Sequence, residues 1–255
     1  MNFVDTHCHI HFPDYALDEE EVYKESLDAG VSKMLVVGCT LEDSKLAIEF
    51  SKKHKNAYPT IGIHPHEARK YVKDKKLLEE FAILAENNSI VGVGETGLDF
   101  YYNNSPKKDQ IKLLEFQLEI AEKHKLPLVL HIRDAFSEFW PVFDNFRGLK
   151  GVVHSFTADR AILEEVLSRE LYVGLNGIMT FTKNTSQLEA ASAVPVQKLL
   201  LETDAPFLTP KPFRGKICKP KHVIVTAEFL ADLRGENLED LSLQTTKNAT
   251  ELFSL

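Results

Sequence analysis

Long apolar runs are absent from this sequence of 255 residues. No stretch approaches the roughly 20 consecutive apolar residues that a membrane-spanning helix requires. The first residues, MNFVDTHCH, contain none of the basic, apolar and small-residue segments that make up a secretory signal. We therefore expect a soluble, cytoplasmic protein that does not associate with membranes.

The sequence also has few cysteines and fewer basic than acidic residues. The three cysteines, Cys8, Cys39 and Cys218, are irregularly spaced and form no Cys-x-x-Cys pair, which argues against both a disulfide framework and a zinc finger. We expect Cys8 and Cys39 to be small buried residues. A net charge of −8 argues against a protein that coats nucleic acid through its overall charge, but not against an enzyme whose positive charge is local.

Short runs rich in Val, Ile and Leu alternate with longer amphipathic stretches along the whole chain, a pattern typical of βαβ units around a parallel sheet. One helix is expected over 105–124, with Ser105 as its cap and Pro106 at its first position, and two more after about residue 220, divided near Gly235. Eight strands are predicted, over residues 3–9, 33–38, 57–64, 89–95, 126–131, 150–154, 171–177 and 198–204.

Eight such units in a chain of this length predict an α/β fold, a closed (β/α)₈ TIM barrel, as a single domain over residues 1–255. The alternative is an open, doubly wound sheet. That fold would need a glycine-rich phosphate loop after the first strand, and the sequence has none there.

Three histidines, His7, His9 and His11, occupy alternate positions near the start of the chain. On a strand, His7 and His9 share one face with Asp5, so that both imidazoles can reach one point. Because Phe12-Pro13-Asp14 predicts a turn, His11 lies beyond the expected strand. Asp5 either orients a ligand imidazole or is a buried carboxylate bound by backbone amides.

Ionisable residues close six of the eight predicted strands, at the end of a barrel where active sites lie: His7, His9, His64, Glu95, His131, His154 and Asp204. Imidazole and carboxylate together suit Zn²⁺, Mn²⁺ or a similar divalent ion, and the set without His64 is larger than one tetrahedral site needs. We therefore predict two ions that share a carboxylate and make a water between them acidic enough to react near neutral pH. In the alternative reading, His131 and His154 bond backbone groups and Asp204 caps the next helix.

The loop after the eighth predicted strand is locally basic. It has no acidic residue and contains Lys211, Arg214, Lys216, Lys219 and Lys221. In a barrel this loop would overhang the metal site, where it could guide a phosphate backbone, although a loop that is merely solvated would have the same composition. After the fourth strand, Tyr101 and Tyr102 could either stack on an exposed base or pack against the next helix.

Several of these segments resemble the signatures of the TatD family of metal-dependent deoxyribonucleases, within the amidohydrolase superfamily. The resemblance runs from Asp5 to about Lys216 and rests on DTHCH (5–9), GIHPH (62–66), GETGLDF (94–100), LHIRDA (130–135), HSFTA (154–158) and LETDAPFLTPKPFRGK (201–216).

The resemblance implies which residues bind each of the two ions. His7, His9 and Asp204 would bind one divalent metal, His131 and His154 a second, and Glu95 would bridge them. Catalysis would then involve Glu95, with Asp204 taking a proton from the attacking water. His64 is expected near the scissile phosphate together with Arg133, and it would act in catalysis by neutralising charge on the phosphate oxygens. Arg214 and Lys216 are expected to contact the substrate.

The family's reaction is hydrolysis of phosphodiester bonds in DNA, typically from a 3′ end. Some relatives remove D-amino acids from tRNA. The alternative function is therefore a metal-dependent esterase or amidase, which either deacylates charged tRNA or opens a small cyclic amide. A barrel that has lost catalysis is disfavoured, because all six metal ligands are present. The same ligands accept Mg²⁺, Mn²⁺ or Zn²⁺, and no protein partner is inferred.

The sequence departs from the family pattern at two places. Where the family usually continues Asn-Glu-Pro after RGK, this chain reads Ile217-Cys218-Lys219-Pro220, and Lys219 reverses a charge near the expected mouth of the site. Ser155 and Ala158 also replace usual residues after the sixth strand. No predicted metal position is affected, so the departures concern substrate choice and loop geometry.

Overall fold

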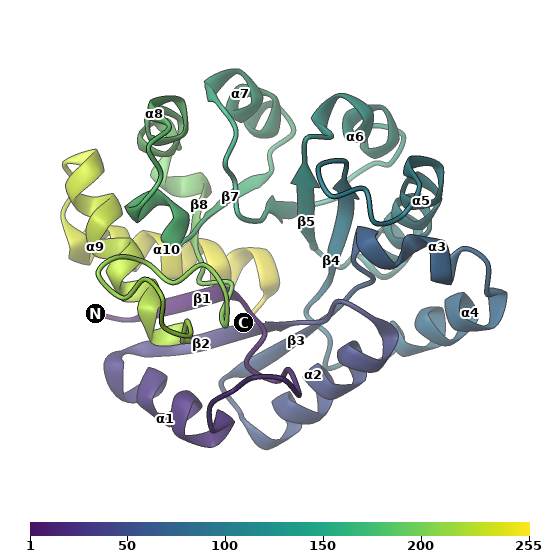
Figure 1. Cartoon of the computed structure of the whole chain (residues 1–255), viewed down its shortest axis with the longest axis horizontal. Helices are drawn as coiled ribbons and strands as arrows, with labels where there is room; N and C mark the ends of the chain where they lie inside the picture. The colour runs from purple at the N-terminus through teal and green to yellow at the C-terminus, as the bar shows by residue number, and fades with distance from the viewer.

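The computed structural model describes all 255 residues and places eight parallel strands side by side in chain order (Figure 1). The predicted (β/α)₈ barrel is therefore confirmed, and the open doubly wound sheet is excluded. The strands are β1 (Phe3–Cys8), β2 (Val31–Val37), β3 (Ala57–Ile61), β4 (Gly92–Asp99), β5 (Leu128–Arg133), β6 (Gly151–Val153), β7 (Tyr172–Leu175) and β8 (Leu199–Leu201).

The barrel is nearly closed by contacts between the first strand and the segment that follows the last one. Cys8 and Ala205 form an isolated parallel bridge, and the backbone N–H of His9 donates to the Ala205 carbonyl over 2.7 Å. The N–H of Asp204 donates to the His7 carbonyl over 2.8 Å. These bonds hold Asp204 beside the two N-terminal histidines.

Helices form the layer outside the strands (Figure 1). The two predicted C-terminal helices are present, separated by Gly235 with its positive φ of 64°. No helix combines the length and the apolar character that crossing a bilayer requires. The helices are α1 (Glu19–Ala29), α2 (Leu41–Lys53), α3 (Ala68–Tyr71), α4 (Lys75–Leu84), α5 (Lys107–His124), α6 (Phe136–Phe143), α7 (Arg160–Ser168), α8 (Thr185–Ala193), α9 (Val223–Arg234) and α10 (Leu238–Phe253), with short 3₁₀ turns η1 (Pro65–Glu67), η2 (Gly177–Thr180), η3 (Val196–Lys198) and η4 (Pro220–His222).

The last helix closes one end of the barrel. Its residues Ala249, Leu252 and Phe253 belong to an apolar cluster that also contains side chains from β1, β2, β5, β6 and β8. A cluster that joins strands from all round the sheet must lie inside the barrel. Phe253 reaches Gly92, the first residue of β4, so α10 covers the end where strands begin and leaves the other end to the site.

The strand boundaries differ most from the prediction at strands that the sequence predicts to end in an ionisable residue. β3 stops at Ile61 and β8 at Leu201, so His64 and Asp204 lie in the following loops. β4 instead begins at Gly92 and continues to Asp99, which puts Glu95 in the middle of the strand. The alternation of apolar residues locates a strand, but the last ladder bond depends on the neighbouring strand.

The prediction that Ser105 caps the 105–124 helix is wrong. The helix begins at Lys107 with Pro106 in the capping position and no side-chain cap. The Ser105 hydroxyl instead donates to the carbonyl of His66 over 2.6 Å and accepts from the N–H of Arg69. Ser105 therefore ties the start of α5 to the loop after β3.

Candidate metal centre

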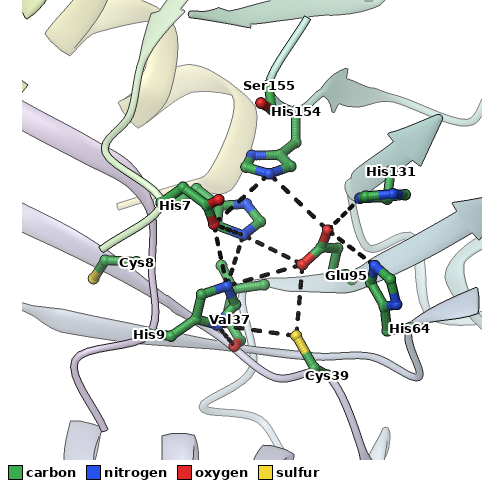
Figure 2. A network of polar contacts seen from close by, with 12 residues as sticks. His7, Cys8, His9, Val37, Cys39, His64, Glu95, His131, His154 and Ser155 are labelled. Atoms are coloured by element: carbon green, nitrogen blue, oxygen red, sulfur yellow. Dashed lines mark hydrogen bonds and ion pairs between the residues drawn. The ribbon is translucent and has the colours of Figure 1, made fainter. Parts of the chain in front are cut away.

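Three predicted ligands, His7, His9 and Glu95, face one another at the open end of the barrel (Figure 2), and Asp204 lies within 3.6 Å of both histidines. His7 Nε2 lies 3.1 Å from His9 Nε2, 3.4 Å from Glu95 Oε2 and 3.6 Å from Asp204 Oδ1. His9 Nε2 lies 3.5 Å from the same Asp204 oxygen and 3.9 Å from Glu95 Oε2.

These distances fit a bound divalent ion. Ligand atoms about 2.1 Å from a tetrahedral ion lie roughly 3.4 Å from one another, close to the separations found here. Two imidazole nitrogens and two carboxylate oxygens also form a donor set that Zn²⁺ and Mn²⁺ accept well. The side chains of His7 and His9 are buried, so that an ion held between them would be shielded from solvent.

The other oxygen of Glu95 faces a second group of imidazoles (Figure 2). Oε1 lies 2.7 Å from His131 Nδ1, 3.6 Å from His64 Nε2 and 4.0 Å from His154 Nε2. His64 is thus nearer to this oxygen than His154, whose ring stacks on His7 with centroids 3.5 Å apart. One carboxylate oxygen for each group is the arrangement that a bridging ligand requires.

Two glycines explain how Glu95 reaches the axis of the barrel. Gly94 and Gly97 have φ values of 153° and 154°, which side-chain-bearing residues rarely adopt. A Cβ atom at Gly97 would collide with the His131 carbonyl, and one at Gly94 with the Val129 carbonyl. The GETG segment therefore lets β4 lie against β5 while Glu95 points inward.

Buried partners set the orientation of the imidazole rings. His9 Nδ1 donates to the Val37 carbonyl over 2.8 Å, which leaves Nε2 free for an ion. His154 Nδ1 lies 3.0 Å from Glu202 Oε1, and His131 Nε2 lies 3.1 Å from Asp99 Oδ2. A carboxylate or carbonyl behind a ligand histidine is common in metal sites because it fixes both tautomer and ring direction.

Our sequence reasoning missed Glu202 and Asp99, although both belong to motifs that it quoted. Each lies an even number of residues from a predicted ligand, two for Glu202 before Asp204 and four for Asp99 after Glu95, the spacing that predicts a shared face on the strands expected from the sequence. That spacing was a usable signal. It could not show which histidine each carboxylate meets, since His154 lies 48 residues from Glu202 in the numbering.

The cluster shifts the pKa values of its own ionisable groups. Burial opposes ionisation of Glu95, but the surrounding imidazoles more than offset it and hold the pKa of its carboxyl well below the ordinary value. The pKa of Asp204 is lowered in the same way, chiefly by His9. Burial and the neighbouring His131 lower the pKa of His64 to about 3, so this imidazole is neutral. Ionised carboxylates at the centre of the site favour cation binding.

Asp5 does not orient an imidazole. Its carboxylate accepts from the Thr203 N–H over 2.9 Å, from the Thr203 hydroxyl over 2.6 Å and from the His7 N–H over 3.3 Å. The alternative of a buried aspartate bound mainly by backbone amides is therefore the observed one. Asp5 thereby joins β1 to the residue next to Asp204.

Two further side chains lie differently from expectation. Cys39 is only partly buried, and its thiol donates to Glu95 Oε2 over 3.5 Å, whereas Cys8 is fully buried as expected. His11 lies outside the cluster and pairs with Asp43 over 2.8 Å, in agreement with a strand that ends before it.

The basic loop residues form no hydrogen bond or ion pair with the cluster. Arg214 donates to the Thr209 carbonyl, and its guanidinium lies 3.9 Å from the centroid of Phe181, while Lys216 approaches Phe213 at 5.8 Å. Lys219 pairs with Glu25 of α1 over 2.8 Å, as does its neighbour Lys221. The charge that Lys219 introduces is therefore offset by α1.

The tyrosines after β4 do not pack against the next helix. Tyr101 and Tyr102 are exposed, and the guanidinium of Arg133 lies 4.3 and 4.8 Å from their ring centroids. Arg133 is the last residue of β5 and is itself exposed, with no acidic partner. A free cation thus lies beside the site.

A barrel with histidines and carboxylates converging at the open end defines this protein as a metal-dependent hydrolase. The chain belongs to the family of TatD related DNases, whose sequence model matches residues 4–254. It is 32% identical over 253 residues to the uncharacterized metal-dependent hydrolase YabD of Bacillus subtilis, covering 98% of each chain.

A second relative and a solved structure also carry the TatD name. The chain is 34% identical over 252 residues to the 3′-5′ ssDNA/RNA exonuclease TatD of Erwinia amylovora, covering 94% of this chain and 95% of that protein. Among solved structures, the TatD homologue YJJV of Escherichia coli superposes with a TM-score of 0.92 at 27% identity, covering 99% of this chain and 98% of that one.

Proposed function

We propose that this hydrolase is a divalent-metal-dependent exodeoxyribonuclease that removes nucleotides from the 3′ end of single-stranded DNA. The observation that carries the proposal is Glu95, which presents one oxygen to His7 and His9 and the other to His131. The name of the Erwinia amylovora relative supports the direction of cleavage and adds RNA to the substrates to be tested.

In this proposal His7, His9 and Asp204 would hold one divalent ion, His131 and His154 would hold a second, and Glu95 would serve as a ligand to each. Two ions at such a site supply Lewis-acid neutralisation of phosphate charge and make a water molecule more acidic. The mixture of imidazole and carboxylate favours Mn²⁺ or Zn²⁺ over Mg²⁺.

The remaining chemistry belongs to the side chains. Asp204 takes the proton of the water that attacks phosphorus. The bond to the O3′ of the preceding nucleotide then breaks, and that oxygen takes up a proton. His64 Nδ1 accepts from the His66 N–H over 3.2 Å, so its Nε2 carries the hydrogen and can donate to a phosphate oxygen. Arg133, Arg214 and Lys216 bind phosphates around the site.

The test is digestion of a 3′-labelled single-stranded oligonucleotide by protein stripped of metal and then supplied with Mg²⁺, Mn²⁺ or Zn²⁺. We expect label release to require a metal and to fall at least a hundredfold in Asp204→Asn, because the proton acceptor is lost. Asp28→Asn is the matched control, since Asp28 is exposed on α1 and forms no ion pair.

Near-native digestion by a folded Asp204→Asn protein at saturating metal would contradict the role given to Asp204. Intact DNA and RNA under every metal, with two ions bound, would contradict the nuclease itself. D-aminoacyl-tRNA is then the substrate to test, because the same ligand set could hydrolyse its ester bond.

A further inference from the structure

Exposed aromatic side chains are confined to the rim of the candidate metal centre. The chain has sixteen phenylalanines, seven tyrosines and one tryptophan. Of these, only Tyr101, Tyr102 and Phe207 are exposed, at 59%, 55% and 53%. The two tyrosines follow β4, and Phe207 lies three residues after Asp204. Aromatic surface gathered around one site indicates a ligand with flat, apolar faces.

Phe207 lies on the side of the centre that holds His7 and His9. Its ring centroid is 6.5 Å from that of His9, with the planes inclined at 61°. The Phe207 N–H donates to the Asp204 carbonyl over 2.8 Å, so the backbone of the aromatic residue is fixed to the loop that carries this predicted ligand.

The tyrosines lie beside the other imidazoles. The ring of Tyr102 is 5.6 Å from that of His66, and His66 shares the carboxylate of Asp99 with His131. The N–H of Tyr102 also donates to Asp99 over 2.9 Å. Figure 2 shows His131 and His9 on different sides of Glu95, so the tyrosines and Phe207 flank the centre from two sides.

Arg133 makes the tyrosine side suitable for a nucleotide. Its guanidinium lies within 4.8 Å of both ring centroids, and the rings meet edge to face at 87°. The cation holds the rings in place and remains available to a phosphate, since no carboxylate pairs with it. Stacking on a ring is tolerant of base identity, because every base has a flat face.

We propose that Phe207 and the Tyr101–Tyr102 pair stack on the two bases that flank the scissile phosphate, one base on each side. This rests on the proposed nuclease function and adds a requirement for two unpaired bases at the cleavage point. Bases within a duplex have both faces covered by their neighbours, so a paired end must fray by two nucleotides before it can be cut.

The experiment pairs side-chain removal with base removal. Three variants are assayed on oligothymidylate: Phe207→Leu, the double variant Tyr101→Leu/Tyr102→Leu, and the control Leu243→Ala. The control removes an apolar side chain that is exposed on α10. Parallel substrates carry an abasic nucleotide at the terminal or the penultimate position. In the Asp204→Asn protein, which is used for binding, 2-aminopurine at the same positions reports stacking by the quenching of its fluorescence.

We expect each aromatic variant to lower kcat/KM by roughly 5- to 100-fold on ordinary DNA. The loss should disappear when the matching base is missing, at a different position for Phe207 than for the tyrosines. Phe207→Tyr should restore most activity, and Leu243→Ala should match the wild type.

Two kinetic results and one fluorescence result would overturn this inference. One is wild-type kcat/KM in both aromatic variants, and the other is a loss of equal size on abasic and ordinary DNA, which would make the rings structural or part of a protein-docking surface. Unquenched 2-aminopurine would likewise count against stacking. If 2-aminopurine is quenched but no strand is cut, the stacking stands and the nuclease proposal fails.

Discussion

Glu202 offers a direct test of how buried groups support the metal centre. It is fully buried, its Oε1 lies 3.0 Å from His154 Nδ1, and the same oxygen accepts from the N–H of Ser155. In Glu202→Gln the amide oxygen can still accept from the Ser155 N–H, but the negative charge beside His154 Nδ1 is lost. Partners of this kind typically contribute 10- to 100-fold to metal affinity.

General hydrogen-bond energies give a similar change in ion affinity. Bonds to charged groups are worth about 1.5–3 kcal/mol and neutral ones about 0.5–1.5 kcal/mol, so the difference corresponds to roughly tenfold or slightly more in ion affinity. The new amide nitrogen would also occupy the place of Oε2, which is buried with no hydrogen-bond partner. That costs about 1–3 kcal/mol of folding free energy.

The assay is calorimetric titration of Mn²⁺ into metal-stripped protein, with Glu228→Gln as the control because Glu228 is exposed on α9 and unpaired. We expect the ion on the His154 side to bind about tenfold to a hundredfold more weakly, while the control is unchanged. Affinity within twofold of the wild type for both ions would refute the positioning role of Glu202.

Three other predictions follow from the fold and its charges. Gly97→Ala should destabilise the protein by about 2 kcal/mol or more, since it forces a Cβ against the His131 carbonyl at positive φ; an unchanged urea midpoint would contradict this. Chelation should lower Tm by roughly 5–10 °C relative to protein with ion at a hundred times its Kd, as measured by calorimetry, and an equal Tm would argue against ion binding by the native state. Lys219 and Lys221 lower the pKa of Glu25 to about 2, so this contact is retained above pH 4.5 and lost as the pH falls toward 2; in Lys219→Ala/Lys221→Ala, a carboxyl-carbon NMR titration should place the pKa near 4.5.

Local patterns explain why some of the architecture was predictable. Apolar alternation depends on neighbours in the chain, so all eight strands could be located from the sequence. The rule that barrel sites lie at strand ends then predicts that His7, His9, Glu95 and Asp204 come together. Strand ends were less accurate, as at β4, because a ladder ends where the neighbouring strand stops pairing.

Capping illustrates how a local rule can fail. Ser105 precedes a proline and an amphipathic stretch, which favours a helix cap. In the folded chain its hydroxyl bonds the carbonyl of His66, which is 39 residues away in the sequence. The hydroxyl bonds a partner from another loop in place of the local backbone, and the helix sequence contains no signal of that partner.

The sequence by itself therefore determined the barrel, the family and the residue types gathered at its open end, because these depend on periodicity, motif and strand direction. Only the tertiary structure decided which oxygen of Glu95 faces which imidazoles, that Glu202 and Asp99 orient His154 and His131, and that Glu25 pairs with Lys219. Each of these depends on side chains from separate strands or helices meeting within about 4 Å, the reach of a hydrogen bond or ion pair. Their distance along the chain carries no information about such contacts.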